Sequence, residues 1–155
     1  MAEKNLLIVG HVPSPNTRTL RDAVQGGASS DEFHGIQVRA LNPFDAGVDD
    51  VLAADAVILG TTENLGYMSG ALKDFFDRTY YGVLEEKQGM PYALYVRAGL
   101  DGTGTIRGVE SIVTGLRWKA VRKPLLLHGD WQPGFADDAF ELGQLVAAGL
   151  EAGVF

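Results

Sequence analysis

Three polar side chains, Ser14, Asn16 and Thr17, follow the apolar run of residues 6–9. They stand at the predicted start of a helix, where unpaired backbone N–H groups and the positive end of the helix dipole bind a phosphate without Lys or Arg. His11 in the same loop is a candidate for a further hydrogen bond to that phosphate. Ser, Asn and Thr are also favoured N-cap residues in any helix, so capping alone is the alternative interpretation.

The same loop lacks the motifs of several other nucleotide-binding and catalytic proteins. Residues 10–20 read GHVPSPNTRTL, without the GxGxxG of dinucleotide-binding domains or the GxxxxGK[ST] of a P-loop. The GxSxG turn of hydrolases is also absent from the chain. A phosphorylation-receiver domain needs an acidic cluster after its first strand, where this chain has Gly10 and His11.

Composition excludes further classes of site and partner. Zero cysteines rule out disulfides, thiolate nucleophiles and cysteine-ligated metals, and they indicate a reducing compartment such as the cytoplasm. The histidines at 11, 34 and 128 have no metal-binding spacing, so no metal is expected. With 13 Lys+Arg against 20 Asp+Glu, the net charge of -7 offers no basic surface for nucleic acid or anionic membranes. Neither a signal peptide nor an apolar stretch of about 18 residues is present, which predicts a protein without a membrane span.

Short apolar runs alternate with amphipathic stretches along the chain, and they define the elements that must position these loops. Continuous apolar runs predict strands buried on both faces at 6–9, 56–59, 92–96 and 125–127, and alternation predicts an edge strand at 36–41. Helices are predicted over 17–25, 48–53, 70–81, 105–117 and 137–152. This alternation favours a five-stranded parallel doubly wound sheet in an α/β fold of three layers.

The length and the predicted fold together locate the functional loops. At 155 residues the chain is expected to form a single domain, 1–155, with strand order 2-1-3-4-5. In open sheets of this kind ligands bind at the carboxyl ends of the strands. The loops that follow the apolar runs are therefore where binding residues are expected.

A longer motif follows the third predicted strand, where residues 61–78 read TTENLGYMSGALKDFFDR. It resembles the flavodoxin-like NAD(P)H-dependent FMN reductases and related quinone reductases, whose loop runs Pro-Glu-Tyr-x-Gly-x-x-Pro/Ser-Gly-x-Leu-Lys-x-x-x-Asp. The residues that match in register are Glu63, Gly66, Gly70, Leu72, Lys73 and Asp77, and Met68-Ser69 matches the quinone-reductase variant. The first loop is similar to the same family in Ser14 and in Asn16-Thr17-Arg18. Thr62 replaces the usual proline, and His11 and Pro13 stand where the family often has serine and arginine.

The resemblance implies a flavodoxin-like fold and an FMN cofactor. It implies a hydride transfer from NAD(P)H through FMN to a small-molecule acceptor such as a quinone or flavin, with no catalytic side chain because the cofactor carries the chemistry. Phosphate binding is assigned to His11, Ser14, Asn16 and Thr17. Contacts to the flavin ring are assigned to Thr62, Glu63, Asn64, Leu65, Gly66, Tyr67 and Met68, with Gly99, Gly102 and Gly104 of the next glycine-rich loop along the ring edge.

Two other functions remain open from the sequence. A flavodoxin-type electron carrier would hold FMN between aromatic side chains and dock a partner through its acidic surface. A binding protein that kept the fold but lost flavin would explain Thr62 and the serine-poor first loop. The aromatic pairs at 75–76 and 80–81 supply more apolar surface than one helix face needs, and they predict a homodimer.

Overall fold

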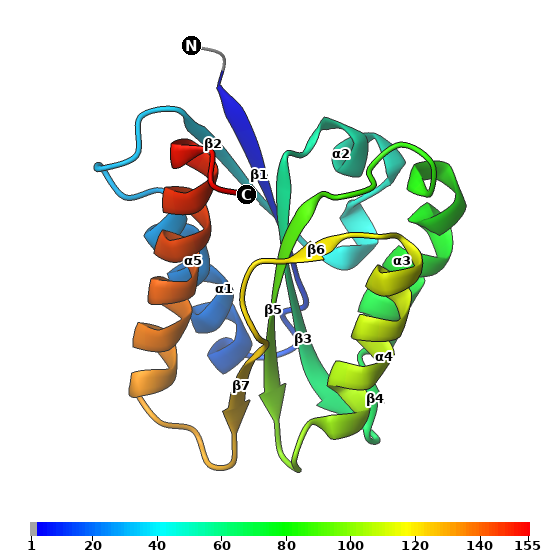
Figure 1. Cartoon of the computed structure of the whole chain (residues 1–155). Helices are drawn as coiled ribbons and strands as arrows, with labels where there is room; N and C mark the ends of the chain where they lie inside the picture. Colours follow the sequence, from blue (N-terminus) through cyan, green and yellow to red (C-terminus); the bar gives the residue numbers. More distant parts are fainter. Residues whose placement is uncertain (1–2) are drawn as a thin grey trace.

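A parallel sheet runs through the centre of the molecule, and its strands form from the apolar runs of the sequence. The computed structural model describes residues 3–155 (Figure 1). The long strands lie in the order β2-β1-β3-β5, with bounds β1 (Lys4–Gly10), β2 (Ile36–Leu41), β3 (Ala56–Asn64) and β5 (Pro91–Ala98). Two short strands, β6 (Lys119–Ala120) and β7 (Leu125–His128), share the position beside β5. The predicted doubly wound sheet and its strand order are therefore confirmed.

Helices cover both faces of this sheet, which gives the predicted three layers (Figure 1). One face carries α1 (Pro15–Ala28) and α5 (Gly134–Ala152). The other carries α3 (Gly70–Val83), α4 (Thr103–Gly115), the short α2 (Val48–Ala53) and the 3-10 turn η1 (Pro43–Asp45). Helices α1, α4 and α5 begin two or three residues before their predicted starts. The first turns of α1 and α4 are polar or glycine-rich, so their apolar period becomes visible only further inside each helix. In α5 the first turn already contains the buried Phe135, which lies outside the helix predicted at 137–152.

The buried phenol of Tyr95 explains why β1 and β3 carry glycine at Gly10 and Gly60. Tyr95 is 2% exposed and packs in the apolar cluster under α1 and α5. A Cβ at Gly10 would lie 2.6 Å from the Tyr95 hydroxyl, and a Cβ at Gly60 would overlap the ring itself. Burial raises the pKa of the Tyr95 phenol far above its ordinary value, so it stays neutral. The two glycines therefore admit an aromatic ring across the carboxyl-terminal half of the sheet.

Helices α1 and α5 pack against each other through two more glycines. Gly27 of α1 faces the backbone of Phe140, and Gly143 of α5 faces the backbone of α1. A Cβ at Gly143 would lie 2.9 Å from the Ala28 nitrogen and 3.0 Å from the Val24 carbonyl carbon. Only a residue without a side chain allows two helix backbones to approach this closely.

The outermost position of the sheet is interrupted. β6 pairs with Pro91 and Tyr92 at the start of β5, whereas β7 pairs with β5 only from Tyr95 onward. Between them residues 121–124 lie opposite two residues of β5, so this segment bulges. The sequence predicted a single strand here, because only the apolar part of the interrupted strand has a recognisable pattern.

The aromatic residues of α3 are mostly buried within the chain itself. Phe75 and Phe76 are 0% and 1% exposed, and Tyr80 packs against the same cluster. Tyr81 is the member of the set that faces solvent, at 85% exposure. The aromatic surface left for an interface is smaller than the sequence indicated, and the homodimer stays a prediction.

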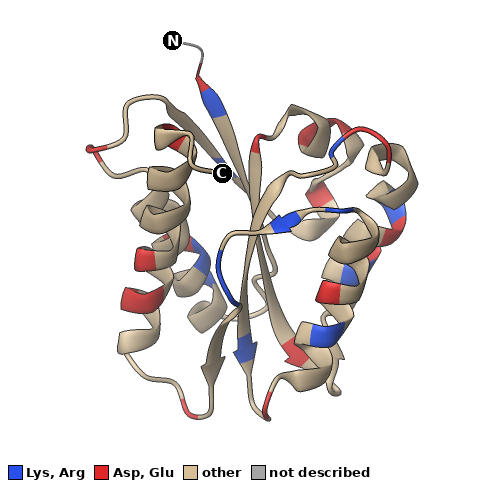
Figure 2. Cartoon of the chain, in the orientation of Figure 1, with Lys and Arg blue, Asp and Glu red and all other residues tan. Residues whose placement is uncertain are grey.

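Figure 2 shows only acidic charges on α5 and only basic charges on the segment 117–123 around β6, whereas α3 carries both signs. On the exposed side of α3, Lys73 pairs with Asp77 at 2.6 Å and Arg78 pairs with Asp74 at 2.7 Å. Such exposed i,i+4 pairs stabilise a helix only modestly. Within residues 3–155, no helix has the length and apolar character needed to cross a bilayer.

Candidate functional site

The first loop at the carboxyl edge ends in a complete helix cap. The backbone N–H of Thr17 donates to the Ser14 hydroxyl at 3.2 Å, and the Ser14 N–H donates to the Thr17 hydroxyl at 3.0 Å. This reciprocal pair is a capping box, and Pro15 occupies the first turn as it does in many helices. Asn16 is exposed beside the cap. The capping interpretation of Ser14 and Thr17 is therefore confirmed, and phosphate binding by this loop stays a prediction.

Two hollows adjoin this loop. One, of about 320 Å³, lies between His11 and Val12 on one side and residues 42–45 on the other. The other, of about 600 Å³, is an open groove along Pro13, Ser14, Pro15, Arg18 and Thr19. Ligand pockets in proteins commonly measure about 300–1,000 Å³. The first loop is thus bordered by space of a size that suits a small ligand.

His11 stands at the mouth of the smaller hollow, held by its backbone N–H, which donates to Gly60 O at 3.0 Å. Burial lowers the pKa of the His11 imidazole below its ordinary value of 6.5. Arg21 of α1 supports the same region, because its guanidinium donates to Asn42 Oδ1 at 2.8 Å and to Gly10 O at 3.3 Å. Near pH 7 the imidazole is neutral, and it can donate one hydrogen bond.

We expect the pKa of the His11 imidazole to change when an anion binds in this loop. Below pH 6.5 the unfolded chain protonates at His11 before the folded protein does, so the free energy of unfolding should fall as the pH decreases from about 6.5. A phosphate dianion beside the imidazole favours its charged form and should raise the pKa again. Urea denaturation above and below pH 6.5 measures the change in the free energy of unfolding, and NMR titration of the imidazole signals, with and without FMN, measures the pKa. His34, at the opposite end of the sheet, is the control; a His11 pKa that FMN leaves unchanged would place the phosphate elsewhere.

The second predicted loop is a β-hairpin rather than an irregular segment. β3 continues to Asn64 and pairs with β4 (Tyr67–Met68), and Leu65-Gly66 forms the two-residue turn. Both turn residues have positive φ, 52° for Leu65 and 77° for Gly66, as a type I′ turn requires. A leucine in this region costs about 1–2 kcal/mol, and Leu65 is fully exposed at the tip. An apolar side chain held in strain at a loop tip is typical of a functional contact.

Hydroxyl groups hold the base of this hairpin. The buried Thr61 hydroxyl accepts the backbone N–H of Ser69 at 3.0 Å, and the Ser69 hydroxyl in turn caps α3 by accepting from Leu72 at 3.1 Å. Thr62, which replaces the proline of the resembling family, donates to Asn64 Oδ1 at 2.8 Å. Met68 is 2% exposed and belongs to the core, so its side chain does not reach the surface.

The hairpin is joined to the glycine-rich loop after β5. The Glu63 carboxylate accepts the backbone N–H of Leu100 at 2.7 Å and that of Gly102 at 2.8 Å. A backbone contact continues the junction into α4. The Gly66 carbonyl group lies very close to Gly104. A Cβ added at Gly104 would be 3.1 Å from the Gly66 carbonyl carbon and nearer still to the Gly66 oxygen. These contacts make the hairpin and the loop at 99–102 one connected surface.

The remaining predicted residues fall on this surface or beside it. The Tyr67 ring, 40% exposed, lies across Gly108 of α4, where a Cβ would come within 3.0 Å of its Cδ1. Gly99 is exposed, and no atom lies within 4 Å of the position a Cβ would take. Gly102 has φ of +70° and caps α4, whereas Gly104 lies inside that helix and not in the loop as predicted.

Sequence reasoning missed several residues that build the site. Leu100 was not singled out, although it is 68% exposed and supplies one of the two N–H groups that Glu63 binds. Gly108 was also missed as the residue against which the Tyr67 ring packs. The spacing of Gly104 and Gly108 could have revealed it, since residues four apart lie on the same face of a helix. Arg21 has no local sequence signal that would mark its hydrogen bonds to β1 and to residue 42.

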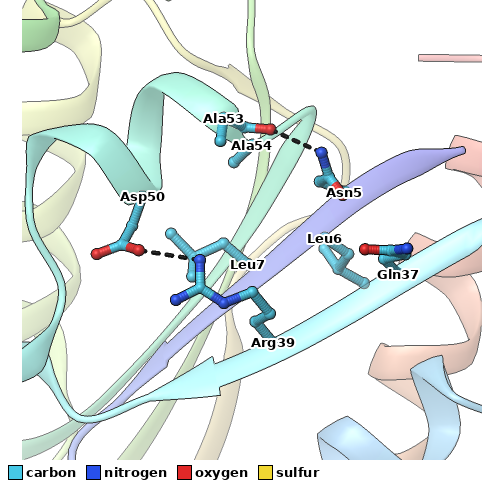
Figure 3. Close-up of a pocket in the computed structure, with 8 residues that line it drawn as sticks. All are labelled: Asn5, Leu6, Leu7, Gln37, Arg39, Asp50, Ala53 and Ala54. Atoms are coloured by element: carbon cyan, nitrogen blue, oxygen red, sulfur yellow. Dashed lines mark hydrogen bonds and ion pairs between the residues drawn. The ribbon is translucent and has the colours of Figure 1, made fainter.

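A separate pocket lies at the opposite, amino-terminal end of the sheet (Figure 3). It occupies the space that the short α2 leaves uncovered over β1 and β2. Asn5 donates to Ala53 O at 3.0 Å on one side, and Arg39 pairs with Asp50 at 2.9 Å on the other. Its volume of about 110 Å³ is too small for a ligand the size of a flavin, for which pockets of about 300 Å³ or more are usual.

Comparison with solved structures identifies the fold. A flavodoxin from the domain Archaea superposes with a TM-score of 0.77 at 18% identity, covering 93% of this chain and 96% of that one. A flavodoxin, WrbA-like protein from Agrobacterium tumefaciens gives 0.74 at 20% identity, with 94% and 96% covered. Two-electron reduced flavodoxin from Megasphaera elsdenii gives 0.74 at 17% identity, with 92% and 98% covered. The chain therefore has a flavodoxin-like fold.

Sequence comparison assigns the family. A curated flavodoxin from Aquifex aeolicus (strain VF5) is 31% identical over 111 residues, which cover 72% of this chain and 59% of that protein's length. The family model for NADPH-dependent FMN reductases matches residues 6–131. The chain belongs to the NADPH-dependent FMN reductase family. The resemblance seen in residues 61–78 is therefore confirmed.

Proposed function

We propose that this protein binds FMN at the carboxyl edge of the sheet and uses NAD(P)H to reduce a small-molecule acceptor such as a quinone or a flavin. The family assignment supports FMN as the cofactor. One observation favours an enzyme over an electron carrier, namely the hydrogen-bonded contact between the β3–β4 hairpin and the loop at 99–102. Because the Glu63 carboxylate joins the hairpin directly to the loop at 99–102, we expect a ring to lie against these loops on one side and not between them.

The residues at this edge fit a molecule with a phosphate at one end and a flat apolar ring at the other. The start of α1 offers the exposed Asn16 and the neutral imidazole of His11 for the phosphate. The connected surface offers exposed apolar side chains, Leu65 and Leu100, and the open backbone at Gly99 for the ring. The hollows around the first loop lie on the phosphate side of this arrangement.

The protein's task in this reaction is to bind and orient. Bound FMN would supply the hydride-transfer chemistry. The hairpin and the loop at 99–102 would hold one face of its ring and leave the other face accessible to the nicotinamide and then to the acceptor. An electron carrier instead benefits from aromatic side chains on both faces. Within the hairpin and the loop at 99–102 the aromatic residue is Tyr67, and it already packs on Gly108.

Titration with FMN, followed by NADPH and NADH oxidation in the presence of a quinone, tests the proposal. Quenching of FMN fluorescence on binding and steady NAD(P)H consumption with the quinone are the expected results. FMN binding without turnover would replace the proposal with a flavodoxin-type electron carrier. A protein that binds no FMN would be a flavin-free binding protein on the same fold.

Asn16→Ala should weaken FMN binding by about 1–3 kcal/mol, the range for hydrogen bonds to a charged group. Stability should hardly change, because the helix cap is made by Ser14 and Thr17 and not by Asn16. Asn5→Ala is a matched control, since Asn5 lies at the opposite, amino-terminal end of the sheet, where its side chain donates to Ala53 O at 3.0 Å. Fluorescence titration of both variants decides the point, and equal FMN affinities would remove Asn16 from the phosphate site.

A further inference from the structure

We infer that Glu63 is a positioning residue, whose carboxylate fixes the hairpin and the loop at 99–102 in the arrangement that receives the flavin ring. The inference rests on the proposed function and adds a role for one side chain in it. Glu63 lies on β3, one residue beyond Thr62, which is the last β3 residue paired with β5. From this point the two strands separate, and the ladder can no longer hold their loops together.

The carboxylate bridges the gap that opens there. Its Oε1 accepts the Leu100 N–H at 2.7 Å and its Oε2 accepts the Gly102 N–H at 2.8 Å. Hydrogen bonds from backbone N–H groups to a carboxylate are roughly twice as strong as those between neutral groups. Because both carboxylate oxygens are used, the two bonds fix the orientation of the loop as well as its distance from β3. Gly102 then adopts its positive φ and starts α4.

This geometry excludes one simpler role for Glu63. A solvated surface charge would not place both oxygens on backbone donors 37 and 39 residues away in sequence. Each oxygen already accepts one backbone N–H of the loop, so the carboxylate has a structural task that is independent of any ligand. We therefore infer that Glu63 acts on the ring mainly through the position of the backbone groups that it holds.

Glu151 provides a matched control elsewhere in the molecule. Its Oε2 accepts two backbone N–H groups, from His34 at 2.7 Å and Gly35 at 3.1 Å, and so ties the end of α5 to the segment before β2. These donors hold the pKa of the Glu151 carboxyl below its ordinary value. The tie lies at the amino-terminal end of the sheet. Removing it tests what the loss of such a bridge does when no binding loop is involved.

The experiment compares Glu63→Ala, Glu63→Gln and Glu151→Ala. Amide hydrogen exchange by NMR on the FMN-free protein reports whether the backbone N–H groups bound by each carboxylate are still protected. Fluorescence titration measures the FMN affinity, and the absorption spectrum of bound FMN reports on the surroundings of the ring. In Glu63→Ala we expect faster exchange at Leu100 and Gly102, a shifted flavin spectrum and FMN affinity lowered about ten- to a hundredfold, since two backbone donors lose their partner. Glu63→Gln keeps one acceptor oxygen and should fall between Glu63→Ala and wild type, even if Glu63→Ala fails to fold.

In Glu151→Ala we expect faster exchange at His34 and Gly35 with wild-type FMN affinity and spectrum. Wild-type affinity and spectrum in both Glu63 variants, with faster exchange at Leu100 and Gly102, would overturn the inference and leave the proposed function intact. An equal loss of affinity in Glu151→Ala would show a general effect on stability and would also overturn it. Failure of the wild-type protein to bind FMN would overturn the proposed function, and the inference with it.

Discussion

Gly27→Ala is expected to lower the free energy of unfolding by about 3 kcal/mol, at the upper end of the usual cost of overpacking. The new methyl group would lie 2.9 Å from the Phe140 carbonyl carbon and 3.1 Å from the Gln144 nitrogen, and it would overlap the Phe140 oxygen. These are backbone atoms of α5 and cannot rotate away as a side chain can. Helices α1 and α5 would have to separate, and the apolar cluster beneath them would lose contacts.

The neighbouring glycine supplies the control for this prediction. A Cβ at Gly26 would lie 3.6 Å from the nearest atom, Cε2 of Phe140, which is ordinary van der Waals contact. Gly26→Ala should therefore stabilise the protein by about 0.5–1 kcal/mol, the usual gain from replacing glycine inside a helix. Urea denaturation of the two variants measures both values. Equal changes in Gly26→Ala and Gly27→Ala would show that the two helices do not pack at the distance described.

Gly104→Ala should lower FMN affinity at least tenfold, or about 1.4 kcal/mol, while the protein still folds. The added methyl group would displace the Gly66 carbonyl and push the hairpin tip away from α4. Because the tip carries Leu65, the surface offered to the ring would lose its shape. The cost to folding is reduced by the better helix propensity of alanine, so the main effect should appear in binding.

Gly70→Ala is the matched control for the Gly104 variant. Gly70 is also in the first turn of a helix at the carboxyl edge, and nothing lies within 4 Å of the position its Cβ would take. FMN titration by fluorescence, together with thermal unfolding, compares the two variants. If Gly104→Ala bound FMN as tightly as Gly70→Ala, the contact between the hairpin and α4 would have no part in the site.

The order of the sheet could be predicted because its central strands β1, β3 and β5 are buried on both faces. The prediction of a strand buried on both faces at 125–127 was wrong in this respect, since Leu126 of β7 is exposed. Short continuous apolar runs such as residues 56–59, bounded by polar or glycine residues, are typical of strands covered on both sides, and their alternation with helices favours a parallel arrangement. The hairpin could not be predicted in the same way. β4 has two residues, and Leu65-Gly66 lacks the Asn-Gly or Asp-Gly signal by which a type I′ turn is usually recognised.

The candidate site could be located from the sequence, whereas its internal contacts could not. The matching motif identified residues 62–68, and the fold placed them at the carboxyl edge. The partners of Glu63 lie 37 and 39 residues further along the chain, and local spacing carries no information about them. The same holds for Tyr67 and Gly108, whose contact depends on how α4 packs beside the hairpin.

The interrupted position beside β5 bears on how the protein behaves at high concentration. An open sheet edge can recruit a strand from another molecule, and long flat edges are the most susceptible. Here one edge is divided between β6, with two residues, and β7, with four, separated by a bulge that contains Pro124. The other edge, β2, carries Arg39 paired with Asp50. Intermolecular β-pairing is thus opposed at both edges, and we expect the folded protein to resist aggregation by strand addition.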